Sequence, residues 1–358
     1  MKLRIKLILL FALSITSIIF VYNDYFLYST PIVKITNIEE EKHDNIKEEY
    51  YNQIITGIIQ NGKYKDNVIE IKNKTSKSGV YDEQIHKNTE IFVELSNNGT
   101  IANSIIGIKR DKYIVILLVI FIDLILIVSN KKGIKSLLSL LVNIIISIIS
   151  IIIFKNNYKS INILILYLLV AVLFIIFSLY ITNGKSKKTL SAIISSIISL
   201  LISFSLSFLI IKLFGKDVSF WTMEYIEVIY DYENFFYVSI LLCGLGAIMD
   251  ISITISSALN ELIEKNPKIK VPILIKSGKE ICKDIVGTMN HVMLYTCYSS
   301  IIPIVFLALR NGMIITNAIS FYGNLELITI LTACISIVLA IPISLYISIY
   351  ILKGGRKW

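Results

Sequence analysis

Long apolar runs dominate the chain and alternate with short polar connections. Most of these runs reach the ~20 residues with which a helix crosses a hydrocarbon core about 30 Å thick. The pattern therefore predicts an all-α polytopic membrane bundle of about eight transmembrane helices. The runs lie near residues 7–22, 113–129, 137–154, 161–182, 189–212, 236–259, 289–309 and 327–351.

One long hydrophilic segment, residues 23–112, interrupts this pattern after the first run. Within it the hydrophobic period changes to two, which is typical of half-buried strands, and Asn-Gly and Ser-Gly pairs mark turns between them. The segment is therefore predicted to be a small extracytoplasmic all-β barrel or sandwich of about five strands. Its charged residues 39–49 are expected to form an exposed linker or a short helix instead. The candidate strands are residues 54–59, 68–71, 90–95 and 105–108.

These patterns divide the chain into three parts. Residues 1–22 have a basic start and an apolar centre but no small-residue cleavage site, so we expect an uncleaved membrane anchor rather than a signal peptide. Residues 23–112 form the β-domain with its charged linker. Residues 113–358 form a seven-helix membrane domain that includes a cytoplasmic amphipathic segment.

Composition and charge agree with a membrane protein. Hydrophobic residues make up 55% of the chain and the mean hydropathy is +0.71, values too high for a soluble domain with a polar surface. If eight spans start from an inner N-terminus, 18 lysines and arginines are cytoplasmic and only five lie in the short outer loops. This positive-inside pattern predicts a cell-membrane protein with both termini cytoplasmic and residues 23–112 extracytoplasmic. It also accounts for the net charge of +9 without a nucleic-acid partner.

Signatures of catalysis and of metal binding are missing from the sequence. There is no P-loop, no H-E-x-x-H helix and no G-x-S-x-G elbow. Only one of the three histidines, His291, lies near a span, which disfavours a multi-histidine metal site. We therefore expect no enzyme, no cofactor and no metal. The cysteines, which we interpret as small packing residues, are Cys243, Cys282, Cys297 and Cys334.

Two connections are unusual. The outer loop at residues 213–235 is acidic and aromatic, and its rings are expected to form an interfacial belt, although its acids could concentrate cations near a pore. The inner connection at residues 260–288 is broken by Pro267 and Pro272 and then gains an apolar face from Leu274 onward. We expect this segment to be a cationic amphipathic helix lying at the inner interface, with its lysines toward anionic head groups.

The sixth run carries a polar stripe with spacings of +4, +7 and +11, which place its members on one helical face. A charged side chain at membrane depth is costly and usually faces a bundle interior or an aqueous cavity. Its aspartate is therefore the best candidate for a transport site. Gly244 and Gly246, which precede the stripe, are expected to allow close helix packing. The stripe consists of Asp250, Thr254, Ser257 and Glu261.

A matching stripe leads into the seventh run, at spacings of +4, +7, +11 and +14. Both stripes reach the inner interface, so we expect them to face each other across a cytoplasmic-side cavity. Asp123, in the second run, is expected to lie at a similar depth to Asp250 and His291. This second stripe consists of Asp284, Thr288, His291, Tyr295 and Tyr298.

Two interpretations of these polar residues remain open. A carboxylate near an imidazole could relay protons or bind a cation. The alternative is a set of polar contacts between helices that fixes their packing. Function is favoured for Asp250, packing is favoured for His291, and the two are balanced for Asp123. An intramembrane aspartyl dyad of Asp123 and Asp250 has no supporting motif.

Two stretches resemble the YibE/F family of bacterial multispan membrane proteins. They run from Gly246-Ala247-Ile248-Met249-Asp250 through residues 256–262, and over residues 278–289, which end in Gly-Thr-Met. The order of an N-terminal span, a small outer domain and a bundle is similar as well. In the family an Asn-Thr pair usually follows Gly-Thr-Met, whereas Asn290-His291-Val292 stands here. The resemblance therefore favours Asp250, Asp284 and the packing residue Gly287 over His291, and it implies an architecture without a substrate.

The leading hypothesis is a secondary permease or exporter with a polar site between the sixth and seventh helices, acting on an unidentified small solute or ion. The runner-up is a non-transporting membrane scaffold or sensor whose outer β-domain binds an envelope partner. A second membrane subunit is a further possible partner in the lipid bilayer. A membrane-embedded enzyme ranks third.

Overall fold

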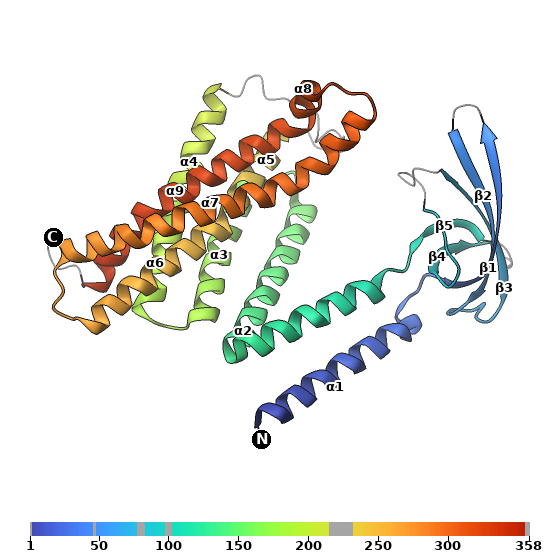
Figure 1. Ribbon diagram of the computed structural model, residues 1–358, viewed down its shortest axis with the longest axis horizontal. Coiled ribbons are helices and arrows are strands. Elements are labelled where there is room, and N and C mark those ends of the chain that lie inside the picture. Colours follow the sequence, from blue (N-terminus) through green and yellow to red (C-terminus); the bar gives the residue numbers. More distant parts are fainter. Residues whose placement is uncertain (1, 46–47, 77–82, 97–101, 215–231, 355–358) are drawn as a thin grey trace. The chain divides into compact units, whose positions relative to one another are not determined.

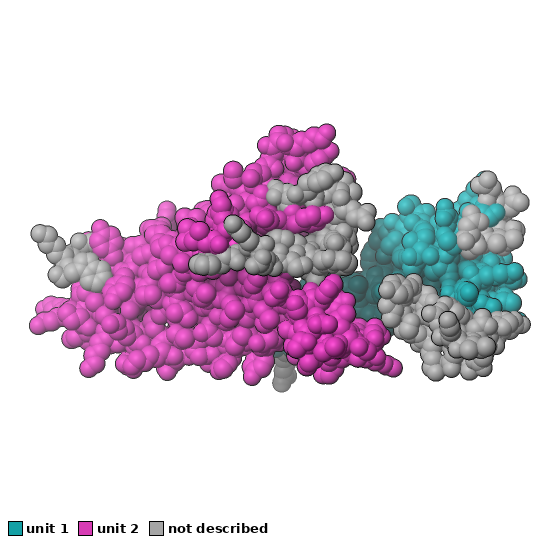
Figure 2. Space-filling view, turned by 90° about the horizontal axis from the view of Figure 1, so that it is seen from above, with its two compact units in different colours: residues 1–133 teal, residues 134–358 magenta. Residues whose placement is uncertain are grey.

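A computed structural model of the chain describes residues 2–45, 48–76, 83–96, 102–214 and 232–354. The chain forms two compact units, Met1–Gly133 and Ile134–Trp358 (Figure 2). Most of the outer loop at residues 213–235 lies outside the described residues, so its aromatic belt stays a prediction.

The first unit contains a five-stranded antiparallel sheet with the strand order β3-β2-β1-β4-β5 (Figure 1). Alternate Val and Ile side chains, such as Val33, Ile35, Ile55 and Ile91, are fully buried and form its core. The prediction of a small all-β domain of about five strands is confirmed. The strands are β1 (Ile32–Asn45), β2 (Glu48–Ile59), β3 (Val68–Ser76), β4 (Glu90–Leu95) and β5 (Ala102–Ile108).

The charged residues 39–49 differ from the expected linker or short helix. Residues 39–45 lie at the end of β1 and residues 48–49 at the start of β2, and the two strands pair from Asn37 opposite Thr56 to Asn45 opposite Glu48. The side chains also contribute, since Gln53 Nε2 donates a 2.7 Å hydrogen bond to Glu40 Oε1. Backbone pairing with a neighbouring strand therefore outweighs the poor strand propensity of the acidic residues.

Helix α1 (Lys2–Tyr22), a short 3-10 turn and the first part of helix α2 (Asp111–Asn157) complete the first unit, and the rest of α2 belongs to the second. The turn η1 (Asp24–Leu27) follows α1, and α2 begins soon after β5. Helix α2 contains a break at Asn130, whose φ of 48° and ψ of −123° are not helical. Asn adopts positive φ more readily than most residues, so the break falls at a suitable side chain.

The second unit is a helical bundle in which α9 packs against α4, α6 and α7 (Figure 1). Its core joins buried residues such as Leu200, Ile248, Ile255, Ile337 and Leu345. The helices are α3 (Ile163–Asn183), α4 (Lys187–Phe214), α5 (Tyr232–Cys243), α6 (Leu245–Lys265), α7 (Val271–Arg310), α8 (Ile315–Ala318) and α9 (Asn324–Leu352), with the π-helical turn η4 (Ile319–Gly323) before α9.

Six helical runs in the described chain are long and apolar enough to cross a membrane, and the expected number of eight is not confirmed. The second and third predicted runs share α2, on either side of Asn130. Helix α1 has 21 residues, of which Phe11–Tyr22 form an apolar stretch within the part described in detail. Hydropathy located the apolar residues correctly, but it could not tell a broken helix from two separate ones.

Helix α7 also differs from expectation. The predicted interfacial helix from Leu274 and the predicted span at residues 289–309 are one continuous helix of 40 residues. Pro272 is tolerated at its start, where a backbone N–H has no helical partner to lose. At 1.5 Å per residue this helix is about 60 Å long, roughly twice the thickness of a hydrocarbon core.

Candidate functional site

Helix α6 has two chemically opposite faces. Its packed face carries Ile248, Ile251 and Ile255, which are at most 1% exposed, together with the fully buried Ser252 and Ser256. The predicted polar stripe lies on the other face. Asp250, Thr254 and Glu261 are exposed there and Ser257 is half-buried.

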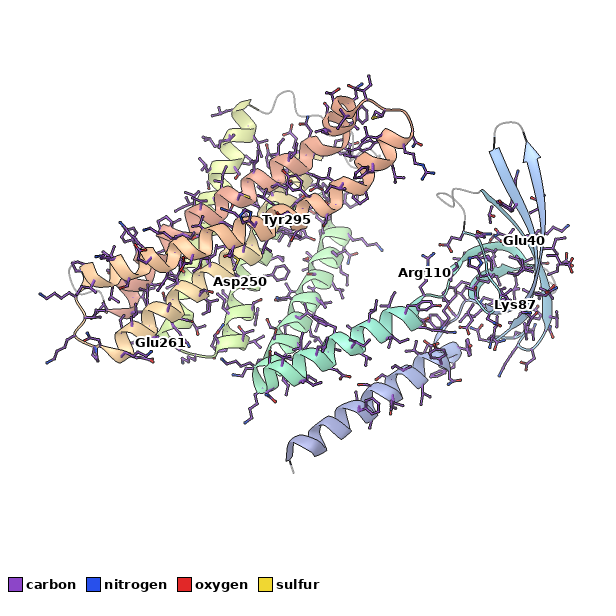
Figure 3. All side chains as sticks on the ribbon, viewed as in Figure 1. Glu40, Lys87, Arg110, Asp250, Glu261 and Tyr295 are labelled. Carbon is purple, nitrogen blue, oxygen red and sulfur yellow. The ribbon has the colours of Figure 1, made fainter. Side chains whose placement is uncertain are left out.

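Asp250 lies near the middle of the 34-residue run Tyr232–Lys265 (Figure 3). Among the described residues, none donates a hydrogen bond to its carboxylate or forms an ion pair with it. Glu261, at the end of the same stripe, does have a partner, because Lys265 Nζ lies 2.7 Å from its Oε1. The carboxylate in the middle of the run is thus the one that remains free to take an external ligand or proton.

The stripe ends at a polar cavity of about 640 Å³. Ser257 and Glu261 line it from α6, and Lys187 and Lys188 line it from the start of α4. The Ser256 hydroxyl donates a 2.8 Å hydrogen bond to the Lys188 carbonyl and so fixes the two helix ends against each other. This geometry connects the predicted stripe to an opening that water and charged solutes could enter.

The second predicted stripe lies on the exposed face of α7. Asp284, Thr288, His291 and Tyr295 are exposed, and the His291 and Tyr295 rings stack with centroids 6.3 Å apart. The Thr288 hydroxyl donates to the carbonyls of its own helix. In the described part of the chain, no hydrogen bond or ion pair joins this stripe to that of α6, so the expected facing arrangement is not made by direct contacts.

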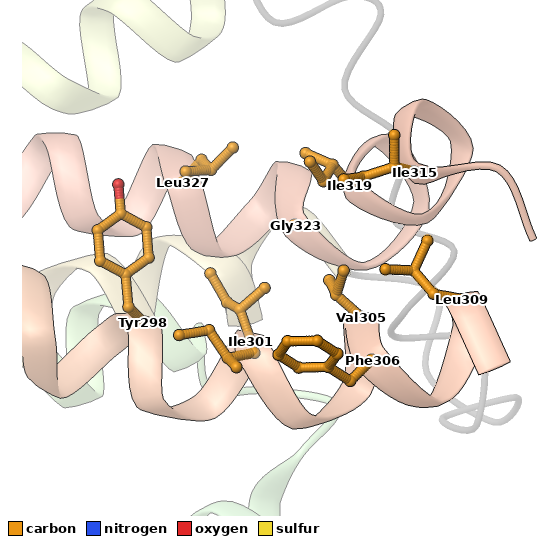
Figure 4. Close-up of a pocket in the computed structure, with 10 residues that line it drawn as sticks. Tyr298, Ile301, Val305, Phe306, Leu309, Ile315, Ile319, Gly323 and Leu327 are labelled. Atoms are coloured by element: carbon orange, nitrogen blue, oxygen red, sulfur yellow. The ribbon is translucent and has the colours of Figure 1, made fainter.

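Tyr298, the last member of the second stripe, lines a different cavity. This cavity has a volume of about 490 Å³ and lies between α7 and the segment from α8 to the start of α9 (Figure 4). Apart from the Tyr298 hydroxyl, its lining side chains are apolar, among them Phe306 and Leu327. It suits a hydrocarbon chain rather than an ion.

A hydroxyl-lined interface between α4, α6 and α9 was not found from the sequence. Ser191 Oγ donates to Ser348 Oγ at 2.8 Å, and the hydroxyls of Ser252 and Ser344 are 2.9 Å apart. The available signal is the serine at every fourth position of α4, which puts one small polar stripe on one face. These serines are Ser191, Ser195, Ser199, Ser203 and Ser207.

The predicted packing glycines have different surroundings. A Cβ at Gly244 would lie 3.3 Å from the Ser336 Cβ of α9, whereas a Cβ at Gly246 or Gly287 would meet no atom within 4 Å. Close packing therefore explains Gly244 and does not explain the other two. Gly278, which the sequence reasoning did not single out as a packing residue, lets α7 approach Leu345 of α9 directly.

Asp123 belongs to the first unit. The Ser14 hydroxyl of α1 donates a 2.6 Å hydrogen bond to Asp123 Oδ2 in α2. This contact fits the packing interpretation of Asp123, since Ser and Asp side chains commonly join neighbouring membrane helices.

A buried ionic cluster was also missed by the sequence reasoning. The Lys109 side chain is fully buried, and its Nζ lies 2.7 Å from Asp24 Oδ1 and 2.6 Å from Asp111 Oδ2. Beside it, Lys112 Nζ lies 2.6 Å from Glu90 Oε1. We call these five residues the Lys109 joint, because they connect η1, β4 and the start of α2. Its signal was the charged run at residues 109–112, at the boundary between the hydrophilic segment and the second apolar run.

Two tyrosines donate hydrogen bonds to carboxylates of the Lys109 joint. The Tyr28 hydroxyl donates to Asp111 at 2.9 Å and the Tyr25 hydroxyl donates to Glu90 at 2.7 Å. Burial and the bond to Asp111 raise the pKa of Tyr28 to about 12. Burial alone would lower the pKa of Lys109, but its hydrogen bonds to Asp111 and Asp24 outweigh that effect and hold this pKa above its ordinary value. Lys109 is therefore a permanent cation in this site.

Comparison with protein-family models shows to which family the chain belongs. Residues 117–354 match the model of the YibE/F-like protein, and residues 26–108 match the YibE/F family N-terminal domain. The chain belongs to the YibE/F family. Comparisons with curated proteins and with solved structures gave no match. Together with its apolar helices, this membership makes the chain a multi-pass membrane protein.

The two family regions frame the Lys109 joint. Lys109, Asp111 and Lys112 lie between the YibE/F N-terminal domain and the YibE/F-like region, whereas Asp250 and Glu261 lie within the latter. Within the described ranges, no group of three or more His, Cys, Asp or Glu side chains could hold a metal ion. The middle of α6 offers the carboxylate of Asp250 with the hydroxyl of Thr254 one turn away.

Proposed function

We propose that this YibE/F protein is a secondary permease or exporter, and that the polar face of α6 forms part of its transport path. The observation that carries the proposal is the position of Asp250. Its carboxylate lies in the middle of an apolar run, on the face opposite the packed core. An aspartate at the bilayer centre costs about 2.5–3.5 kcal/mol on insertion scales, so such residues usually face water or a substrate.

The surroundings of Asp250 support a path rather than an isolated charge. Thr254 and Ser257 follow it at one-turn intervals and offer hydroxyls that can replace water around a cation or a polar solute. Ser257 also lines the polar cavity at the end of α6. A solute could therefore exchange hydration for protein oxygens in steps.

The charge distribution supports an orientation for this path. Lysines cluster at the α3–α4 turn and the α6–α7 turn, which favours a cytoplasmic position for the cavity at the end of α6. In this arrangement both termini are cytoplasmic, residues 23–112 are extracytoplasmic and the protein lies in the cell membrane. The solute or ion, the direction of its movement and any coupling ion are left open.

The test compares ion and metabolite contents of a deletion strain restored with wild type, Asp250→Asn or Asp66→Asn. Asp66 is a matched control for the same chemical change, since it lies in the exposed β2–β3 turn with a φ of 67° that Asn also adopts. We expect wild type and Asp66→Asn to restore the content of one solute and Asp250→Asn to fail, at equal protein levels in the membrane. Full restoration by Asp250→Asn would rule out the proposal.

The Lys109 joint favours a second candidate, a membrane scaffold or sensor that binds an envelope partner through its β-domain. Its buried ion pairs fasten the β-domain to the start of α2 and so provide a mechanical link. This candidate predicts that deletion of residues 40–110 abolishes function, while Asp250→Asn lowers only the amount of protein. The same complementation experiment, with the deletion added, separates the two candidates.

A further inference from the structure

The turn between α3 and α4 has an unusual combination of charge and apolar surface. It reverses the chain within three residues, with Gly184 at a φ of 73°. A cavity of about 420 Å³ opens beside it. Lys185, Ser186 and Lys187 line one part of this cavity, and Tyr180, Leu190 and Ile193 line the other.

The lysines of this turn are electrostatically unsatisfied. Among the described residues, Lys185, Lys187 and Lys188 have no ion-pair partner. The nearby acids of α6 are already engaged, since Glu261 pairs with Lys265 at 2.7 Å and Glu264 accepts a 2.7 Å hydrogen bond from Asn260. The turn therefore presents an excess of positive charge that no described side chain neutralises.

The apolar part of the cavity identifies the kind of anion. Tyr180 and Leu190 are 51% and 52% exposed, and they belong to helices long and apolar enough to lie in a bilayer. A free phosphate would gain nothing from these side chains, whereas an acyl chain would bury them. The cavity between α7 and α9 provides a contrast, because it has the apolar lining without lysines.

We propose that this cavity binds an anionic phospholipid. The head-group phosphate lies against Lys185 and Lys187, and an acyl chain follows Leu190 and Ile193 along α4. Basic pockets beside membrane helices are suited to such head groups, and each lysine adds to the attraction. Lys187 also lines the polar cavity at the end of α6, but the lipid site does not include Asp250 and is proposed whether or not the protein transports a solute.

The experiment uses the purified full-length protein, stripped of lipid in detergent and titrated with dioleoyl phosphatidylglycerol or dioleoyl phosphatidylcholine. Native mass spectrometry counts the bound lipids. We expect wild type to bind phosphatidylglycerol in preference, and Lys185→Gln/Lys187→Gln to bind it about thirty-fold more weakly. Lys276→Gln/Lys279→Gln is the matched control, because it removes two exposed lysines of α7 and should bind like wild type.

Further arms keep the outcome decisive. Leu190→Ser leaves the lysines in place and should also weaken phosphatidylglycerol binding, which a site for head groups alone would not show. Inorganic phosphate in large excess over the lipid should not displace it. Three results would each overturn the proposal. They are an equal loss of phosphatidylglycerol binding in the two double-lysine variants, unchanged binding in Leu190→Ser, and displacement of the lipid by inorganic phosphate.

Discussion

Lys109 has its whole side chain out of solvent between two carboxylates. A buried ion pair adds little net stability relative to an apolar replacement of both partners, because desolvation opposes the attraction. Removal of one partner has a different result, since it leaves the remaining charges buried without compensation. Lys109 therefore supplies the positive charge that compensates the carboxylates of Asp24 and Asp111.

At this scale we predict that Lys109→Met destabilises the β-domain by ~3–5 kcal/mol. Hydrogen exchange of the β1–β4 amides in the detergent-solubilised full chain measures the change. Arg110→Met is the control, because the Arg110–Glu83 pair is 60% and 38% exposed and such pairs contribute at most about 1 kcal/mol. Similar effects of the two substitutions would contradict the assigned role of the joint.

Single residues also show what the sequence could predict. Spacing alone placed Asp250, Thr254, Ser257 and Glu261 on one face of α6, because helical geometry fixes that relation. It could not find the partner of Lys109, since Asp24 is 85 residues away in the chain. An ion pair between residues far apart in the chain depends on the tertiary fold, so a local sequence pattern cannot predict it.

At the scale of elements, the contact of α7 with α9 depends on Gly278, because a glycine has no side chain to separate the two helices. A Cβ at Gly278 would overlap the Leu345 side chain and lie 3.4 Å from Leu259 Cδ2 of α6. Small residues at such crossings let helices approach closely enough for dispersion forces to hold them together in lipid. Gly278 is therefore a contact residue of three helices.

We predict that Gly278→Leu lowers the stability of the bundle by about 1–3 kcal/mol, because the added atoms overpack the crossing. Gly287→Leu, nine residues further along the same helix, is the control, since its Cβ position is open to 4 Å. The thermal unfolding midpoint of each variant in the same detergent gives the comparison. A larger loss for Gly287→Leu would disprove the assignment.

Helices and strands were predicted well where the hydrophobic pattern is strong. They were predicted less well where contacts with neighbouring segments determine the secondary structure. The apolar runs followed from their length and composition, and the β-domain followed from a hydrophobic period of two. The β1–β2 hairpin was missed in its charged part, because pairing with the next strand stabilises residues that do not favour strands by themselves. The continuity of α7 was missed because the charged amphipathic segment from Leu274 was interpreted as an interfacial helix separate from the apolar run at residues 289–309.

At the scale of the whole molecule, the proposed topology would place residues 23–112 outside the cell and the α6–α7 turn in the cytoplasm. We predict that a membrane-impermeant maleimide labels Lys87→Cys of the β-domain in intact cells and labels Lys276→Cys of α7 only after permeabilisation. Both side chains are exposed, so accessibility within the fold does not separate them. The unsubstituted protein, whose four cysteines lie in its helices, gives the background. Labelling of Lys276→Cys in intact cells would contradict the predicted cytoplasmic position of this part of α7.

The break in α2 at Asn130 has a mechanical consequence for the molecule. A helix passes torque along its axis through its ladder of backbone hydrogen bonds, and a residue with non-helical dihedral angles interrupts that ladder. The regular helical stretch that starts at the Lys109 joint therefore ends at Asn130, and the residues of α2 beyond it form a separate helical segment.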